Sequence, residues 1–188
     1  MSNSTHVYGT AKALTSNAYS LTGYTFNGWN TSTNGTGTNY ANGYTIPANT
    51  GLTTTANATV NLYAKWKANT YTIVYNANGG SGSMSNSTHT YDQSKTLTKN
   101  AFTKSGYIFI GWATSSTGNV AYVDEASVLN LLTSGTITLY AVWVKEGTVR
   151  IFVDGQYKMA QVYVFDNGSW HLSQPYISDS NEWKLNGG

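Results

Sequence analysis

The chain has 188 residues, a formal net charge of +2 and charged side chains at only 10% of positions, which leaves room for one or two small domains. Its 15 Tyr, 6 Trp and 5 Phe argue against disorder, because disordered sequences are poor in aromatic residues. Its ten Lys and Arg residues are scattered, so no nucleic-acid partner is expected, and the absence of cysteine excludes disulfides and thiolate metal sites.

No segment of the sequence has the features of a membrane span or an export signal. No apolar run approaches the roughly 20 residues that a membrane-spanning helix needs. Residues 1–10 lack a basic region followed by an apolar core, which is the pattern of a secretory signal. Export would therefore need a signal upstream of this sequence, or release by cell lysis as for phage particles.

An internal repeat begins at the first residue. The hexapeptide Met1–His6 recurs unchanged as Met84–His89, and the match continues in the same register. Its further pairs are Tyr8 with Tyr91, Leu14 with Leu97, Asn17 with Asn100, Phe26 with Phe109 and Gly28-Trp29 with Gly111-Trp112. After a variable loop the copies rejoin at Leu62–Trp66 and Leu139–Trp143. Residues 1–69 and 70–145 are therefore predicted to be two copies of one module.

Two segments of each copy have the residue spacing of a β-strand. In Gly23–Trp29, the period of two predicts Tyr24, Phe26 and Gly28 on one face and Trp29 on the other. In the closing segments, inward positions are predicted for Val60, Leu62, Ala64 and Trp66, and for Ile137, Leu139, Ala141 and Trp143. The tryptophans at the repeat-defining positions, Trp29, Trp66, Trp112 and Trp143, are predicted to pack in the cores.

The two copies differ most between these strands. In the second copy, the Ala, Val and Leu spacing of Asp124–Leu132 permits one short helix, with Asp124 and Glu125 at its solvated start. In the first copy, Gly35, Gly37 and Gly43 predict a longer, irregular loop. Long loops on rigid scaffolds often carry recognition, so Thr31–Thr55 is a candidate binding loop.

The second copy begins with Tyr71–Gly80, an alternating segment that ends in a turn signal. The pattern Tyr-x-Ile-x-Tyr-x-Ala-Asn-Gly-Gly, Leu-Thr, Gly-Tyr-x-Phe-x-Gly-Trp and Leu-Tyr-Ala-x-Trp resembles the Listeria–Bacteroides repeat over roughly residues 1–145. The resemblance implies a mainly β (α+β) fold of tandem β-grasp-like modules, each a sheet with at most one short helix. It also implies occurrence on bacterial surface proteins, including internalin-type B-repeats, and in phage-associated proteins.

The first copy lacks the segment equivalent to Tyr71–Ser83, because Met1 aligns with Met84. A sheet without that strand has an unpaired edge, which invites strand addition. One hypothesis is that the strand comes from another chain, as in a strand-exchange oligomer, or from Thr148–Asp154, where Val149, Ile151 and Val153 alternate. The alternative is a simple truncation with no strand supplied.

The tail, residues 146–188, has a shorter period of its own. Asp154-Gly155, Asn167-Gly168 and Ser180-Asn181 recur every thirteen residues, each followed within two positions by Tyr or Trp. Turn residues between short apolar runs are typical of hairpins, so three C-terminal β-hairpin repeats are predicted. They loosely resemble short aromatic repeats of phage and prophage proteins. Because exposed aromatic rings can stack on sugars, the candidate ligand contacts are Trp170, Trp183, Tyr163 and Tyr176.

The sequence offers little for catalysis. Residues 1–91 contain no Asp or Glu, so the first copy has no carboxylate pair. His6 and His89 occupy the same repeat position, which favours a structural role, and His171 is expected to be a surface group. The glycine-rich Asn78–Gly82 leads to no helix and is predicted to be a turn. No catalytic residue, cofactor or metal is therefore expected, and the chain is not expected to be an enzyme.

The expected function is a non-catalytic, surface-displayed spacer, adhesion or binding module on a bacterial envelope or phage particle. Its partner would be a glycan or a protein on a cell surface. The alternative is a phage virion structural protein, a head or tail decoration or fibre subunit, that docks on other virion proteins through its tail or an unpaired edge strand. Both alternatives imply an extracellular location without a membrane span.

Overall fold

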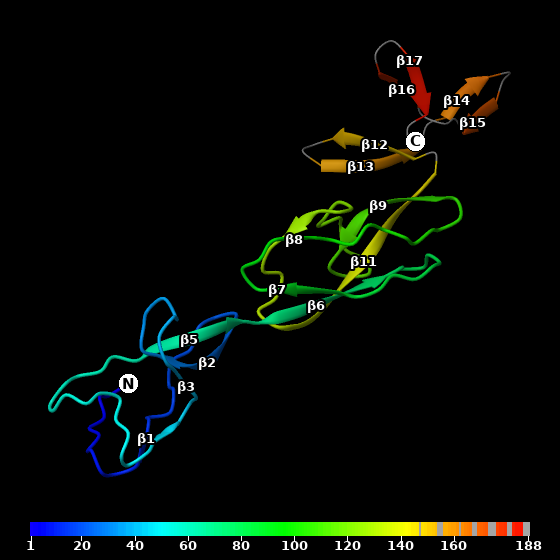
Figure 1. Cartoon of the computed structure of the whole chain (residues 1–188). Helices are drawn as coiled ribbons and strands as arrows, with labels where there is room; N and C mark the ends of the chain where they lie inside the picture. Colours follow the sequence, from blue (N-terminus) through cyan, green and yellow to red (C-terminus); the bar gives the residue numbers. More distant parts are fainter. Residues whose placement is uncertain are drawn as a thin grey trace. The chain divides into compact units, whose positions relative to one another are not determined.

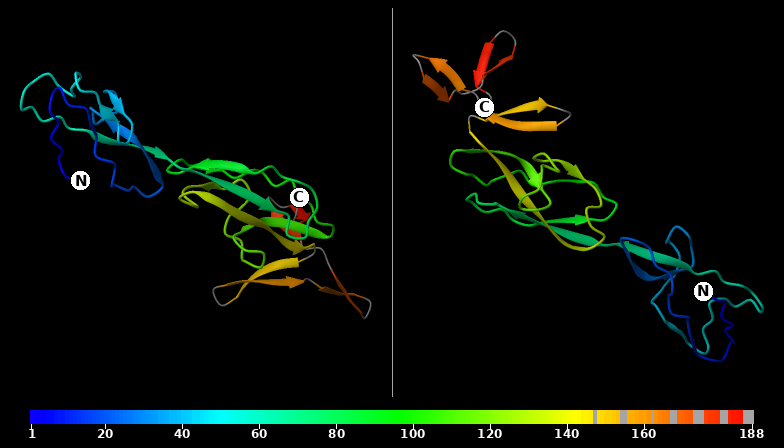
Figure 2. Two further views of the ribbon diagram at one scale, coloured as in Figure 1. Left: turned by 90° about the horizontal axis from the view of Figure 1, so that it is seen from below. Right: turned by 180° about the vertical axis from the view of Figure 1, so that it is seen from behind.

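The computed structural model describes residues 1–146 with their side chains, and the backbone of 148–153, 156–161, 163–166, 169–172, 176–179 and 182–185. All regular elements in these ranges are β-strands (Figures 1 and 2), so the predicted mainly β class is confirmed. The chain divides into two compact units. The first consists of Met1–Thr72, Thr88–Lys95 and Val128–Thr136, and the second of Ile73–Ser87, Thr96–Ser127 and Ile137–Gly188.

The first repeat contains five strands. They are β1 (Lys12–Ala13), β2 (Tyr24–Asn30), β3 (Asn39–Tyr40), β4 (Thr45–Ile46) and β5 (Tyr63–Ala68). Strands β3, β2 and β5 form an antiparallel sheet in that order, and β1 pairs with β4. Leu14, Trp29 and Ile46 form the core, against which Phe26 and Leu62 are among the partly buried side chains that pack.

The second repeat contains six strands. They are β6 (Thr70–Asn76), β7 (Ser87–Thr90), β8 (Lys95–Thr96), β9 (Tyr107–Ala113), β10 (Ser127–Val128) and β11 (Gly135–Lys145). Four of them form a sheet in the order β7-β6-β11-β9, and β8 pairs with β10. Strands β9 and β11 correspond to β2 and β5 of the first repeat, while β6 is the strand that the first repeat lacks.

The tail consists of three antiparallel strand pairs. They are β12 (Thr148–Val153) with β13 (Gln156–Gln161), β14 (Tyr163–Asp166) with β15 (Ser169–Leu172), and β16 (Tyr176–Asp179) with β17 (Glu182–Leu185). The predicted hairpin repeats are thus confirmed, while the turns Asp154-Gly155, Asn167-Gly168 and Ser180-Asn181 lie outside the described residues. Because β12 pairs with β13, the hypothesis that Thr148–Asp154 completes the first repeat is wrong.

Hydrogen bonds at equivalent positions repeat in both copies. Lys12 Nζ donates to the Thr5 carbonyl at 2.8 Å, and Lys95 Nζ donates to the Thr88 carbonyl at 2.8 Å. The Leu14 amide donates to the Tyr44 carbonyl at 2.9 Å, and the Leu97 amide to the Ala126 carbonyl at 2.9 Å. The sequence repeat is therefore also a repeat of local structure.

The predicted facing of the Gly-Trp motif is wrong, because a β-bulge lies within it. Phe26 pairs with Trp66 but Trp29 with Ala64, so β2 carries one extra residue there. The bulge turns Trp29 onto the same face as Phe26, with ring centroids 5.0 Å apart and Trp29 only 5% exposed. In the second repeat, a register shift between Val142 and Trp143 does the same for Phe109 and Trp112, whose centroids are 4.9 Å apart.

The short helix permitted over Asp124–Leu132 is absent, and these residues form a turn followed by β10. Glu125 and Asn130 adopt φ values of 54°, which a right-handed helix does not accommodate. The Asp124 carboxylate accepts hydrogen bonds from the Asn100 amide at 2.9 Å and the Glu125 amide at 3.1 Å. Asp124 therefore holds a turn against the loop before β9 and does not begin a helix.

Strand β6 fills the centre of the second repeat. Its inward side chains Tyr71, Ile73 and Tyr75 are 1%, 0% and 6% exposed. The Tyr71 ring stacks on His89 with centroids 5.4 Å apart and an interplanar angle of 26°. His89 is 1% exposed, and burial, assisted by the nearby Lys95 ammonium, lowers the pKa of its imidazole. The neutral ring is therefore part of the packing.

The bulge can be tested with two matched substitutions. Gly106 and Gly111 both have positive φ, 72° and 140°, but a Cβ at Gly106 meets nothing within 4 Å while one at Gly111 lies 2.6 Å from the Tyr122 carbonyl oxygen. We expect Gly106→Ala to lower the free energy of unfolding by about 1–2 kcal/mol and Gly111→Ala by about 1–3 kcal/mol more. Urea unfolding followed by Trp fluorescence measures both, and equal losses would contradict this account.

The pKa of His89 predicts a pH dependence of stability. Because the folded state holds the pKa of His89 below its ordinary value of 6.5, the unfolded state binds the proton first as the pH falls. Stability should therefore drop as the pH falls through 6.5 toward the lowered pKa, and remain unchanged above it. Urea midpoints at about pH 7.5 and about pH 5 test this. We expect the drop to shrink in His89→Gln and persist in His6→Gln, and a drop of the same size in both variants would refute the assignment.

Candidate functional site

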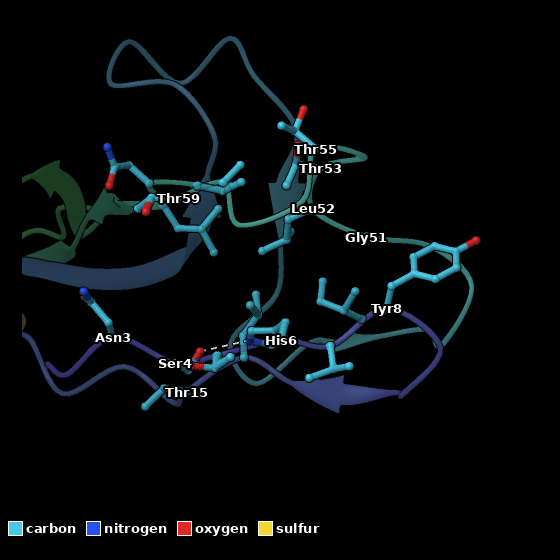
Figure 3. A pocket seen from close by; sticks show the side chains of 18 of the residues that line it. Asn3, Ser4, His6, Tyr8, Thr15, Gly51, Leu52, Thr53, Thr55 and Thr59 are labelled. Carbon is cyan, nitrogen blue, oxygen red and sulfur yellow. Dashed lines mark hydrogen bonds between the residues drawn. The ribbon is translucent and has the colours of Figure 1, made fainter.

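The first repeat contains an open groove of about 1190 Å³ where the missing strand would lie. One wall is formed by residues 1–8 and the other by residues 50–62. Figure 3 shows Ser4 and His6 on one side of the groove, and Leu52, Thr53 and Thr59 on the other. All lining residues belong to the first unit, so the groove is a feature of that unit by itself.

The floor of the groove is the apolar core of the first repeat. Leu14, Trp29 and Ile46 line it and are 6%, 5% and 6% exposed. Leu62, from the segment that leads into β5, also lines it and is half-buried, whereas its equivalent Leu139 is fully buried. The groove therefore presents the face that the second repeat covers with β6.

The N-terminal wall is a strand of the second repeat without its partner. Ser4–Val7 aligns with β7, yet it forms no strand. Ser4 Oγ and His6 Nε2 form a hydrogen bond of 2.9 Å, drawn in Figure 3. His6 is half-buried, while the equivalent His89 is 1% exposed beneath Tyr71. The difference follows from the absence of a tyrosine at that place in the first repeat.

The groove has no acidic side chain. Residues 1–91 contain no Asp or Glu, and the ammonium of Lys12 is held by the Thr5 carbonyl. In the part of the chain whose side chains are described, no three His, Asp or Glu side chains come together as a metal site. An uncharged, apolar occupant fits this lining best, because a buried cation would find no carboxylate to pair with.

The first carboxylate of the chain, Asp92, is engaged in a polar cluster of the first unit. Tyr24 Oη donates to Asp92 Oδ2 at 2.9 Å, and this bond raises the pKa of the Tyr24 phenol. The Asp92 amide donates to Asn130 Oδ1 and Asn130 Nδ2 donates to Asp92 Oδ1, both at 2.6 Å. Both oxygens of Asp92 thus accept hydrogen bonds within the fold, which suits a structural role.

The candidate binding loop Thr31–Thr55 is organised at its start by Asn30, a residue that the sequence reasoning missed. Asn30 is 0% exposed, and its Nδ2 donates to the Gly37 carbonyl and to Asn39 Oδ1 at 3.0 and 2.8 Å. Its Oδ1 accepts from the amides of Ser32 and Gly37 at 2.7 and 3.1 Å. The signal in the sequence is the exchange of Asn30 for Ala113 between the copies, since only the longer loop needs these bonds.

The four predicted ligand contacts lie in two hairpins of the tail. Tyr163 and Trp170 belong to β14 and β15, and Tyr176 and Trp183 belong to β16 and β17. Their side chains lie outside the described residues, so their role stays a prediction. The four tryptophans of the repeats do pack in the cores as predicted for Trp29 and Trp112, at 5% and 0% exposure, while Trp66 and Trp143 are half-buried.

Among the described residues no helix has the length and apolar character needed to cross a membrane. A protein of Evansella cellulosilytica named as a Gly-rich membrane protein is 31% identical to this chain over 127 residues. The match covers 66% of this chain and 14% of that relative, so the chain spans a small part of the relative's length. No solved structure is significantly similar to the chain.

The family model of the Listeria–Bacteroides repeat domain matches residues 1–65 and 71–142. The two matches coincide with the two copies that share hydrogen bonds, bulges and core tryptophans. They cover well over half of the chain, and they leave out the strand that is missing from the first copy. The chain therefore belongs to the Listeria–Bacteroides repeat family.

Proposed function

We propose that this chain is a non-catalytic binding module displayed on a bacterial envelope, where it serves in adhesion. The open groove of the first repeat is the observation that carries a binding role. A pure spacer has no need of an uncovered core, because exposing apolar surface to water lowers stability without a return. The membership of the repeat family and the relative named as a membrane protein support display at the envelope.

A non-catalytic role is supported by the state of the acidic groups. The first repeat has no carboxylate, and the carboxylates of Asp92 and Asp124 accept hydrogen bonds that hold turns. General acid–base chemistry requires a group free to reach a reacting atom. Neither of these aspartates meets that requirement.

Display can be tested by immunolabelling of cells that encode the chain. Antibodies raised against the purified chain should label intact cells about as strongly as permeabilised cells, and brief protease treatment of intact cells should remove the label. An antibody against a cytoplasmic protein serves as the control for cell integrity. Labelling that appears only after permeabilisation, or that sediments with phage particles, would overturn the envelope proposal.

The predicted ligand contacts of the tail can be tested separately on a glycan array. If Trp170 and Trp183 stack on sugar rings, the double variant Trp170→Ala/Trp183→Ala should lose binding at least tenfold, because stacking contributes about 1–3 kcal/mol when water is excluded. Trp183→Phe keeps an aromatic ring and should retain most of the signal. Silence of the unaltered chain across bacterial and mucin glycans would remove the sugar as ligand and leave a protein partner.

A further inference from the structure

We propose that the groove of the first repeat binds a β-strand supplied by another polypeptide. The strand is an uncharged, extended segment in which inward positions alternate as aromatic, β-branched and aromatic. This inference deepens the binding role proposed above by giving the partner's chemistry. It concerns the purified chain, so its test is independent of where the chain is displayed.

The second repeat shows the same groove in its occupied form. There, β6 covers the floor, and Tyr75 packs on Trp112 with ring centroids 4.9 Å apart. Tyr75 Oη also accepts a hydrogen bond from the Thr98 amide at 2.9 Å. The equivalents in the first repeat, Trp29 and Thr15, both line the open groove. The groove therefore offers an incoming tyrosine the same ring and the same amide.

The end of the strand has a second anchor in the occupied copy. Trp143 Nε1 donates to the Ala77 carbonyl at 2.8 Å, one residue after β6 ends. The equivalent of Trp143 is Trp66, which is present in the first repeat with the same packing against a phenylalanine. An incoming strand that continues for one residue past the groove would place a carbonyl within reach of the Trp66 indole.

The backbone on both sides of the groove is also suited to a strand. In the second repeat, β6 lies between β7 and β11. In the first repeat, β5 is the last strand of its sheet in the described residues, and Ser4–Val7, which aligns with β7, is not in a strand. A strand inserted between them would extend the sheet by β-augmentation, in which main-chain hydrogen bonds contribute affinity and side-chain pockets contribute specificity.

The size of the groove favours a peptide over a small molecule. Small-molecule sites usually have volumes of about 300–1,000 Å³, whereas this groove is about 1190 Å³. The absence of Asp and Glu from residues 1–91 further disfavours a strand with inward lysine or arginine. A segment like Tyr-x-Ile-x-Tyr satisfies both the volume and the lack of charge.

The strand is not supplied by the described part of this chain. Strand β6 is held between β7 and β11, and each of the strands β12 to β17 pairs with its neighbour in the tail. The remaining long strands, β2 and β9, are paired with β5 and β11. Among the described residues every strand of suitable length is thus already engaged, which points to a strand supplied in trans.

The test uses the chain with a synthetic peptide of residues Asn69–Asn78, which reproduces β6 and the Ala77 carbonyl. We expect saturable binding by fluorescence anisotropy of the labelled peptide. Hydrogen–deuterium exchange should slow at residues 4–7 and along β5. It should not change along β11, which already has its partner and serves as the internal control.

Two peptide variants test the register without altering the protein. Ile73→Asp places a charge at a position that is 0% exposed in the occupied copy, and Thr72→Asp places the same charge at a half-buried neighbour on the other face. We expect Ile73→Asp to weaken binding at least tenfold, or about 1.4 kcal/mol, and Thr72→Asp to weaken it far less. Equal weakening would indicate adhesion without the alternating register and would overturn the proposal.

Two protein variants locate the site. Trp66→Phe keeps a ring but removes the indole donor and should weaken binding severalfold. A variant with residues 70–83 fused ahead of Met1 restores the spacing of the second repeat. It should unfold at a higher temperature and no longer bind the peptide. If the fused variant still binds the peptide as well as the original chain, or if the original chain does not bind it, the proposal is wrong.

Discussion

The packing of each repeat depends on one close approach between a glycine and a carbonyl oxygen. A Cβ at Gly28 would lie 2.6 Å from the Tyr40 carbonyl oxygen, and one at Gly111 the same distance from that of Tyr122. Only glycine permits this approach together with a positive φ. The bulge it creates turns the following tryptophan inward, where it packs beside a phenylalanine that also contacts the tryptophan of the closing strand. The core and the floor of the groove both follow from this turn.

The sequence predicted the elements of the fold better than their details. The identical hexapeptides and the shared Gly-Trp and Leu-Tyr-Ala motifs were sufficient to predict two modules of strands. The inward side of Trp29 was not predictable from a period of two, because one inserted residue reverses every later position. The helix over Asp124–Leu132 was wrong for a related reason. Apolar spacing does not reveal that Glu125 and Asn130 adopt positive φ, or that Asp124 caps a turn.

The groove was partly predictable, since aligning Met1 with Met84 already showed that a strand is absent from the first repeat. The alignment did not show that the loop residues 50–62 leave the position open, or that Thr148–Val153 is paired within the tail. Asn30 was also beyond reach. Its burial depends on carbonyls and amides of the loop that follows, which sequence patterns do not place. Side-chain details of this kind depend on tertiary contacts and cannot be deduced from local periodicity.

The side chains of β5 bear on which chains can meet at its open edge. Lys65 and Lys67 lie on this strand, and Lys65 Nζ donates to Asn39 Oδ1 at 2.7 Å. Two identical β5 edges that approached one another would bring lysines of both molecules together without any carboxylate to neutralise them. Lysine on an edge strand is a common protection against aggregation. The first repeat can therefore keep an uncovered edge while remaining soluble among its own copies, and its selectivity begins with the exclusion of itself.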